Sequence, residues 1–320
     1  MSDKAGGNES GVVAIVGGGS IGVAFAIVFA GAGRLVRLYE PDANRRAGIP
    51  QLLRARLDDL REYSLLHEAP DAIGRRVALT GDLAEAVQGA VYVQECAPEI
   101  LALKKELFAE LDRVAPLQAV LASASSFIAA SVFAADLPGR RRVLVAHPGN
   151  PPFLIRVVEI VPAPFTDPES VQAASSLLES AGMEPVLVRK EVEGFVFNRL
   201  QGALLREAYC LVRDGVVSVE DVDRIVRDGL GMRWSIIGPF ETADLNTQGG
   251  IASHAEKMGP SYARMGAERG QHDPWTPDLV ARVTEERRAL LPLDRWAERV
   301  AWRDRRLMSL ARHRKSERQG

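Results

Sequence analysis

The sequence has few of the features that mark secreted, membrane-embedded or disulfide-stabilised proteins. Its 320 residues include only two cysteines, Cys96 and Cys210, which suits a reducing compartment and two structural thiols. No apolar run is long enough to span a bilayer, and residues 1–10 are polar without the apolar segment of a signal peptide. We therefore expect a cytoplasmic protein that begins with a flexible tail over residues 1–10.

Excess charge of one sign and metal-ligand spacing are missing as well. The 40 basic and 42 acidic residues give a formal net charge of −2, and this balance argues against nucleic acid or a membrane surface as the main partner. The histidines show no metal-ligand spacing; they are His67, His147, His254, His272 and His313. We expect a small-molecule partner and no bound metal.

A glycine-rich turn follows the first apolar run of the chain. The turn reads Gly17-Gly18-Gly19-Ser20-Ile21-Gly22 and lies between the predicted strand Val12–Val16 and the helical stretch Val23–Ala32. Gly17 permits the tight turn, Gly19 lets the backbone approach a pyrophosphate, and Gly22 lets the helix pack closely on the strand. The free N–H groups at the helix start favour a diphosphate. We expect dinucleotide contacts from Gly17, Gly19, Ser20, Ile21 and Gly22.

An acidic residue closes the next apolar run, Leu35 to Tyr39. Glu40 lies about 20 residues beyond the glycine turn, where a carboxylate accepts hydrogen bonds from the ribose hydroxyls and repels a 2′-phosphate. The spacing therefore predicts NAD rather than NADP as the cofactor. Arg45 and Arg46 argue for NADP, because a nearby arginine can hold the 2′-phosphate. The alternative is that these two arginines belong to the solvated face of the next helix.

Strand and helix signals alternate over the first part of the chain and then give way to helices. Short apolar strands are predicted at 77–79, 90–94, 119–123, 143–147, 157–161 and 186–188, with helices at 101–114 and 167–181. This pattern predicts an α/β fold with a Rossmann-type, doubly wound, mostly parallel sheet. Helical periodicity dominates later, at 198–213, 218–229, 278–290 and 295–312. We expect an NAD-binding domain over residues 11–192 and an all-helical domain over residues 193–320.

One histidine lies where chemistry is expected on such a sheet. His147 ends a predicted strand and is followed by prolines, and Glu159 lies twelve residues on, within the next predicted strand. An imidazole beside a carboxylate can act as a general base, as the oxidation of an alcohol by NAD requires. Taken alone, the two residues also fit a purely structural role.

Several segments together resemble the L-3-hydroxyacyl-CoA dehydrogenase family, and within it the lambda-crystallin or L-gulonate 3-dehydrogenase branch. The likeness runs from about Val12 to the C-terminal region. The segments are His147-Pro148-Gly149-Asn150-Pro151-Pro152, Ser123-Ala124-Ser125-Ser126, Glu193-Gly194-Phe195-Val196-Phe197-Asn198-Arg199, Gln94-Glu95-Cys96-Ala97-Pro98-Glu99, Leu103-Lys104-Lys105, Gly229-Leu230-Gly231-Met232-Arg233 and Trp302-Arg303-Asp304. The combination is more specific than any one motif.

The resemblance implies a role for individual residues. His147 would be the general base with Glu159 as its partner, while Ser126 and Asn198 would bind the reacting oxygen. The alternative is that Ser126 caps a turn and Asn198 caps a helix. The remaining implied contacts are Glu99 and Lys104 on the nicotinamide ribose side of the cofactor, and Asn150 on the substrate.

The sequence also departs from the family and carries one clue to the substrate. Ala124 replaces a usual Ser or Asn, and Gly149 replaces a more common apolar residue, which puts the substrate in doubt. Arg233 matches the gulonate-type branch and could hold a carboxylate, so that a small free hydroxy acid is expected; an interface or surface arginine is the alternative. For CoA phosphates the available cations are Arg54, Arg56 and Arg61.

Three functions remain open at this point. The first is NAD-dependent oxidation of the 3-hydroxyl of a small, L-gulonate-like hydroxy acid. The second is dehydrogenation of short 3-hydroxyacyl-CoA esters such as 3-hydroxybutyryl-CoA, in fatty acid metabolism. The third is a non-catalytic NAD(H)-binding protein of the crystallin kind. The amphipathic helices and the resemblance further predict a homodimer through the helical domain.

Overall fold

The computed structural model describes residues 11–62, 65–269, 276–299 and 302. Contacts divide the chain into two compact units, residues 1–205 and 206–320, with the division inside α8 (Phe197–Arg213). The tail over residues 1–10 and the part of the helix expected after residue 302 lie outside the described residues.

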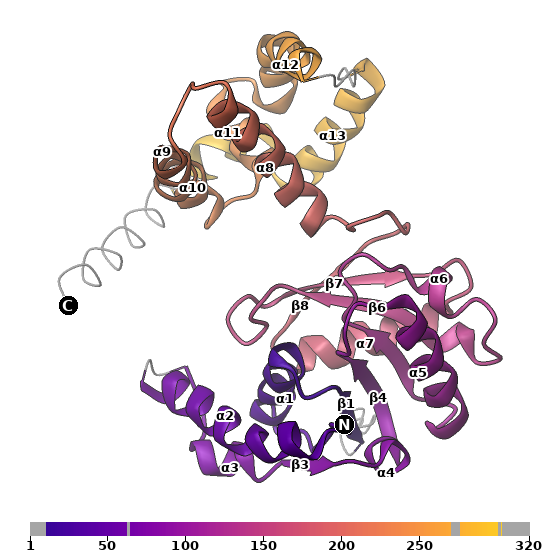
Figure 1. Ribbon diagram of the computed structural model, residues 1–320. Helices are drawn as coiled ribbons and strands as arrows, with labels where there is room; N and C mark the ends of the chain where they lie inside the picture. Colours follow the sequence, from indigo (N-terminus) through magenta and orange to yellow (C-terminus); the bar gives the residue numbers. More distant parts are fainter. Residues whose placement is uncertain (1–10, 63–64, 270–275, 300–301, 303–320) are drawn as a thin grey trace, which may run out of the picture. The chain divides into compact units, whose positions relative to one another are not determined.

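The first unit is built on an eight-stranded sheet (Figure 1). The strand order is β3-β2-β1-β4-β5-β6-β7-β8, and only the β6–β7 pair is antiparallel among these neighbours. The strands are β1 (Val12–Val16), β2 (Val36–Tyr39), β3 (Val77–Thr80), β4 (Ala90–Glu95), β5 (Val120–Ser123), β6 (Val143–Pro148), β7 (Val157–Pro162) and β8 (Glu184–Leu187). The mostly parallel, doubly wound sheet is confirmed.

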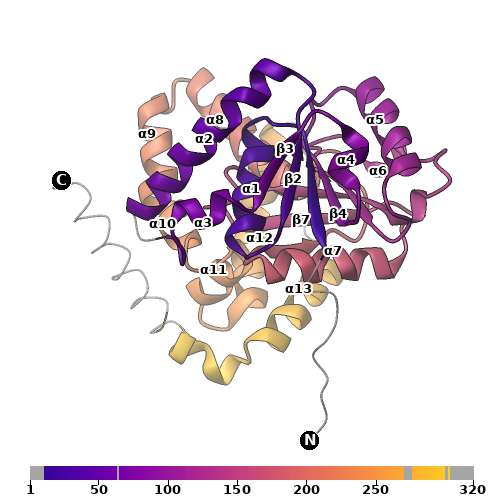
Figure 2. The ribbon, with the colours of Figure 1, turned by 90° about the horizontal axis from the view of Figure 1, so that it is seen from below.

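Helices cover both faces of this sheet, and each face has its own core (Figure 2). Side chains of β1 alternate between them: Val13 and Ile15 pack toward α1 (Ser20–Gly31), and Ala14 and Val16 pack toward α5 (Leu101–Val114). The other helices of this unit are α2 (Ala43–Glu62), α3 (Pro70–Gly74), α4 (Leu83–Val87), α6 (Ala130–Phe133), η1 (Arg140–Arg142) and α7 (Pro168–Ser180). Burial on both faces explains why the strands read as continuous apolar runs.

Helices are the only regular elements among the described residues of the second unit (Figure 1). After the end of α8 it contains α9 (Val219–Arg224), η2 (Ile225–Leu230), α10 (Gly231–Trp234), α11 (Pro239–Asn246), α12 (Gly250–Glu268), α13 (Pro277–Leu290) and η3 (Leu293–Arg295). None of the described helices is long and apolar enough to cross a membrane.

The helical stretch predicted over 218–229 is present, and the structure shows that it consists of two helix types. The α-helix ends at Arg224 and continues as a π-helix over Ile225–Leu230, whose wider turn is closed by the Gly231 N–H donating to the Val226 carbonyl. A Cβ on residue 231 would lie 2.8 Å from that carbonyl oxygen, so glycine is what permits this closure. Sequence periodicity does not separate the two helix types over so short a stretch.

Candidate active site

The glycine turn leads from β1 into α1 with little room to spare. Gly17 has φ +112°, and a Cβ on Gly22 would lie 1.9 Å from the Gly17 carbonyl oxygen. Both positions therefore require glycine. A Cβ on Gly19, in contrast, would meet no described atom within 4 Å, and no described side chain caps the N-terminus of α1. Open space in front of free helix N–H groups fits a dinucleotide diphosphate; Ser20 and Ile21 form the first turn.

Glu40 is fixed beside this turn. Its carboxylate accepts hydrogen bonds from the Gly18 N–H at 3.1 Å and the Asp42 N–H at 3.0 Å, and the side chain is buried. Arg45 is paired with the same carboxylate at 3.0 Å, while Arg46 donates to the Glu40 carbonyl at 2.7 Å. The two arginines that could have held a 2′-phosphate are thus engaged with Glu40 itself.

We expect Glu40→Ala to weaken NAD binding and to relax discrimination against NADP. The substitution removes the ribose acceptor and the charge that repels a 2′-phosphate, and it releases Arg45. The measurement is the ratio of kcat/KM with NAD to that with NADP, which should fall at least about tenfold on loss of a charged hydrogen-bond partner. Asp59→Ala, an exposed acid on α2, is the matched control; an unchanged ratio in Glu40→Ala would contradict the assignment.

His147 and Glu159 face each other across the antiparallel β6–β7 pair. They are register partners, and His147 Nδ1 lies 2.7 Å from Glu159 Oε2. Both residues are buried. Burial alone raises the pKa of Glu159, but hydrogen bonds from His147 and from the N–H groups of Phe197 and Val196 outweigh it, so the pKa lies below its ordinary value. An ionised carboxylate only accepts, so Nδ1 donates the hydrogen of this contact and Nε2 is the ring nitrogen that remains for a ligand.

The turn before α8 completes this pair. Glu159 Oε1 accepts hydrogen bonds from the Val196 N–H at 2.7 Å and the Phe197 N–H at 3.0 Å. Gly194 (φ 74°) and Phe195 (φ 48°) are both left-handed, and this bend aims the two N–H groups at the carboxylate. Phe195 is fully buried, with its ring centroid 5.7 Å from that of His147. Burial of the ring offsets the strain at a non-glycine residue.

Ser126 and Asn198 come together at the same edge of the sheet. Asn198 Nδ2 donates to the Ser126 carbonyl oxygen at 3.2 Å, which joins the serine turn after β5 to the first turn of α8. Within the described residues no hydrogen bond engages the Ser126 hydroxyl, and the side chains of Ser126 and Asn198 are half-buried.

Asn150 lies exposed in the turn after β6. Gly149 leaves the space that Ile155 fills, since a Cβ there would lie 2.3 Å from Ile155 Cγ2.

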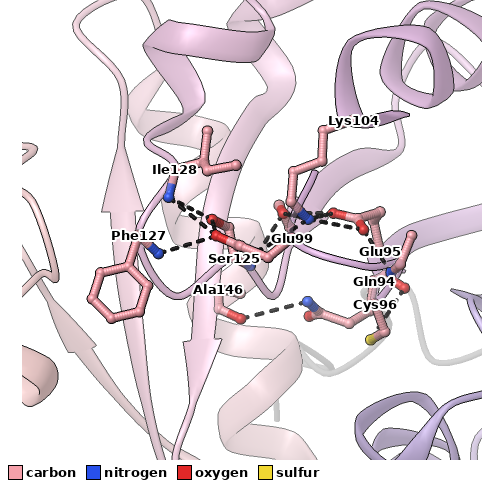
Figure 3. A network of polar contacts seen from close by, with 11 residues as sticks. Gln94, Glu95, Cys96, Glu99, Lys104, Ser125, Phe127, Ile128 and Ala146 are labelled. Carbon is pink, nitrogen blue, oxygen red and sulfur yellow. Dashed lines mark hydrogen bonds and ion pairs between the residues drawn. The ribbon is translucent and has the colours of Figure 1, made fainter. Parts of the chain in front are cut away.

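Glu99 and Lys104 lie next to the serine turn (Figure 3). Lys104 is 1% exposed, and its ammonium donates hydrogen bonds to both carboxylate oxygens of Glu95. Glu99 is more open and accepts hydrogen bonds from the serine turn. Their expected contacts with the cofactor stay a prediction.

Arg233 belongs to the helical unit. It lines a cavity of about 450 Å³ together with Thr242, His254 and the aromatic residues Trp234, Phe240 and Tyr262. It is the one charged residue of that lining, and its Nε is buried without a hydrogen-bond partner within the described part of the chain. Nη1 lies 3.5 Å from Asn246 Oδ1. A guanidinium without an acidic partner among the described residues, in a largely apolar cavity, suits an anionic group.

Sequence reasoning missed two features of the site. Glu95 and Ser123 are completely buried at the ends of β4 and β5 and bind Lys104. The signal was available, because both residues close strands at the edge where ligands bind. The backbone N–H groups that hold Glu159 had no side-chain signature and could not be read from the residue types.

Two family models match most of the chain. Residues 12–192 match the 3-hydroxyacyl-CoA dehydrogenase NAD binding domain, and residues 194–289 match the C-terminal domain of the same enzymes.

Individual relatives cover most of the chain. It is 38% identical over 307 residues to the lambda-crystallin homolog of Mus musculus, covering 94% of this chain and 96% of that protein. It is 36% identical to an L-carnitine dehydrogenase of Streptomyces griseus, covering 82% and 76%. A solved 3-hydroxyacyl-CoA dehydrogenase of Archaeoglobus fulgidus superposes with a TM-score of 0.70 at 25% identity, covering 94% and 99%. The chain therefore belongs to the 3-hydroxyacyl-CoA dehydrogenase family and is an NAD-dependent dehydrogenase.

Proposed function

We propose that the protein oxidises the 3-hydroxyl of a small, L-gulonate-like hydroxy acid to the 3-keto acid, with His147 as the general base. The observation that carries this proposal is the 2.7 Å contact between His147 Nδ1 and a buried, ionised Glu159. This contact leaves Nε2 as the proton acceptor at the edge of the sheet where ligands bind. The same geometry serves the reverse reaction, in which the protonated imidazole returns the proton.

The proton step follows from groups that the chain itself supplies. Nε2 of His147 takes the hydroxyl proton, and Glu159 stabilises the imidazolium that forms. The glycine turn and Glu40 would hold NAD, which would supply the acceptor for the hydride that leaves the carbinol carbon. The Ser126 hydroxyl and the second N–H of the Asn198 amide are donors for the reacting oxygen, because only one amide hydrogen is used on the Ser126 carbonyl.

Arg233 supports a free acid as substrate. It is a guanidinium without an acidic partner in the described residues, and its cavity contains no other charged side chain. A carboxylate would satisfy the buried Nε and receive a bidentate hydrogen bond. By contrast, Arg54 and Arg61, which could have met CoA phosphates, are paired with Asp58, and Arg54 also with Asp71.

A substrate panel tests the proposal. NADH formation is followed with free 3-hydroxy acids, including L-gulonate and 3-hydroxybutyrate, and with the CoA thioester 3-hydroxybutyryl-CoA. We expect turnover of free acids, and we expect Arg233→Met to raise their KM at least about tenfold by removing a charged hydrogen bond. Faster turnover of the thioester would favour a short-chain 3-hydroxyacyl-CoA dehydrogenase. Tight NADH binding with no turnover of any member would favour a non-catalytic, crystallin-like role.

The homodimer also belongs to this proposal. Large apolar side chains are exposed on the helical unit, among them Ile225 at 59% and Phe240 at 57%. Large contiguous apolar patches on soluble proteins commonly mark interaction sites. We infer that a second copy of the chain covers part of this surface.

A further inference from the structure

A fully buried ion pair joins the end of β4 to the start of α5. Lys104, at the start of α5, is 1% exposed, and Glu95, at the end of β4, is 0% exposed. The Lys104 ammonium lies 2.9 Å and 3.1 Å from the two carboxylate oxygens of Glu95. Ser123 donates to Glu95 at 2.6 Å and accepts from the Ser125 N–H at 3.2 Å.

Stability alone does not account for this pair. Removing two charges from water costs about as much as their attraction returns, and a packed apolar pair in the same place is often as stable or more stable. The pair does, however, fix the position of the Lys104 ammonium beside Glu99, which lies in the loop that joins β4 to α5 (Figure 3). The structural question is which group this fixed ammonium orients.

Glu99 is that group. Its Oε2 lies 3.6 Å from the Lys104 ammonium, which leaves Oε1 directed at the serine turn. Oε1 accepts hydrogen bonds from Ser125 Oγ at 2.5 Å, from the Phe127 N–H at 3.1 Å and from the Ile128 N–H at 3.2 Å. Burial alone raises the pKa of Glu99, but these bonds and Lys104 lower it below its ordinary value. One oxygen therefore ties down the residues on both sides of Ser126.

We propose that Glu99, oriented by the Glu95–Lys104 pair, is a positioning residue for Ser126. The inference rests on the proposed function in that Ser126 binds the reacting oxygen. From Ser126 the contacts continue, because its carbonyl accepts a hydrogen bond from Asn198 in α8. At the start of that helix the Val196 and Phe197 N–H groups hold Glu159. Glu99 thus acts on turnover through the serine turn, whereas a contact with the cofactor ribose would act on NAD binding.

A double-mutant cycle separates these two roles. We expect Glu99→Ala to lower kcat, measured at saturating NAD, about 10- to 100-fold, the scale on which small misplacements act. In a Ser126→Ala background the same substitution should change kcat less than about threefold, because its effect passes through Ser126. Equal effects in both backgrounds, or a loss confined to the KM for NAD, would overturn the inference. Glu106→Ala, an exposed acid on α5, is the matched control.

A second readout does not depend on turnover. Glu99 is the acceptor that the structure shows for the Phe127 N–H, so Glu99→Ala should speed hydrogen exchange of this amide at least about tenfold in the cofactor-free protein. Glu99→Gln keeps an oxygen for the turn and should restore most of the protection. Unchanged hydrogen exchange of the Phe127 amide in Glu99→Ala would overturn the inference, even if no substrate is found. Faster exchange in a protein that turns over no substrate would contradict the proposed function and not the hydrogen bond from Phe127 to Glu99.

Discussion

His147→Gln is expected to lower kcat by about two to four orders of magnitude, the usual scale for loss of a general base. Glutamine fills a similar volume and can donate an amide hydrogen to Glu159 Oε2 in place of the His147 Nδ1 hydrogen, so the fold should persist. It cannot accept a proton at neutral pH, and this is the property that the reaction requires. The measurement is single-turnover formation of NADH with the best substrate of the panel.

The control for His147→Gln is a histidine of the same unit without a role in the site. His67 is exposed beyond α2, and His67→Gln should leave kcat and stability as they are. NADH affinity, measured by nicotinamide fluorescence, should be near wild type in both variants, because the glycine turn and Glu40 are untouched. Retained turnover in His147→Gln would refute the role as base, and loss of NADH binding would show that the residue is structural.

Glu159→Gln is expected to be almost as damaging, although it changes a single atom. The N–H groups of Val196 and Phe197 require an oxygen at the Oε1 position, so the amide nitrogen of glutamine must face His147. That nitrogen donates to Nδ1 and drives the hydrogen to Nε2, which is the wrong tautomer for a base. We expect kcat to fall by about two to four orders of magnitude, with NADH affinity retained. Glu184→Gln, at the exposed start of β8, is the matched control.

The same carboxylate should be visible in the acid stability of the protein. The pKa of Glu159 is below its ordinary value of 4.5 in the folded chain, so its charged form stabilises the fold. This contribution is complete above pH 4.5 and is lost as the pH falls from 4.5 through the lowered pKa. Below pH 4.5 the melting temperatures of wild type and Glu159→Gln should therefore converge. A constant difference across that range would show that Glu159 is not an ionised anchor of α8.

Most of the fold was accessible from local pattern. Strands buried on both faces read as apolar runs, and the glycine turn has a steric requirement at Gly17 and Gly22 that no other residue meets. His147 and Glu159 could be paired because one ends a predicted strand and the other lies within the next predicted strand. The cofactor class followed from the turn and Glu40, and the family match agrees with it.

What the amino-acid order determined alone is the set of groups that local rules can recognise: a glycine turn, an acid after the second strand, a histidine before prolines, and helices by their period. What only the tertiary structure decided is how these groups are held. The Val196 and Phe197 N–H groups on Glu159, the three hydrogen bonds on one oxygen of Glu99, and the burial of Lys104 all join residues distant in sequence. Backbone donors carry no residue signature, and burial depends on every neighbouring element, so neither can be read before the chain is folded.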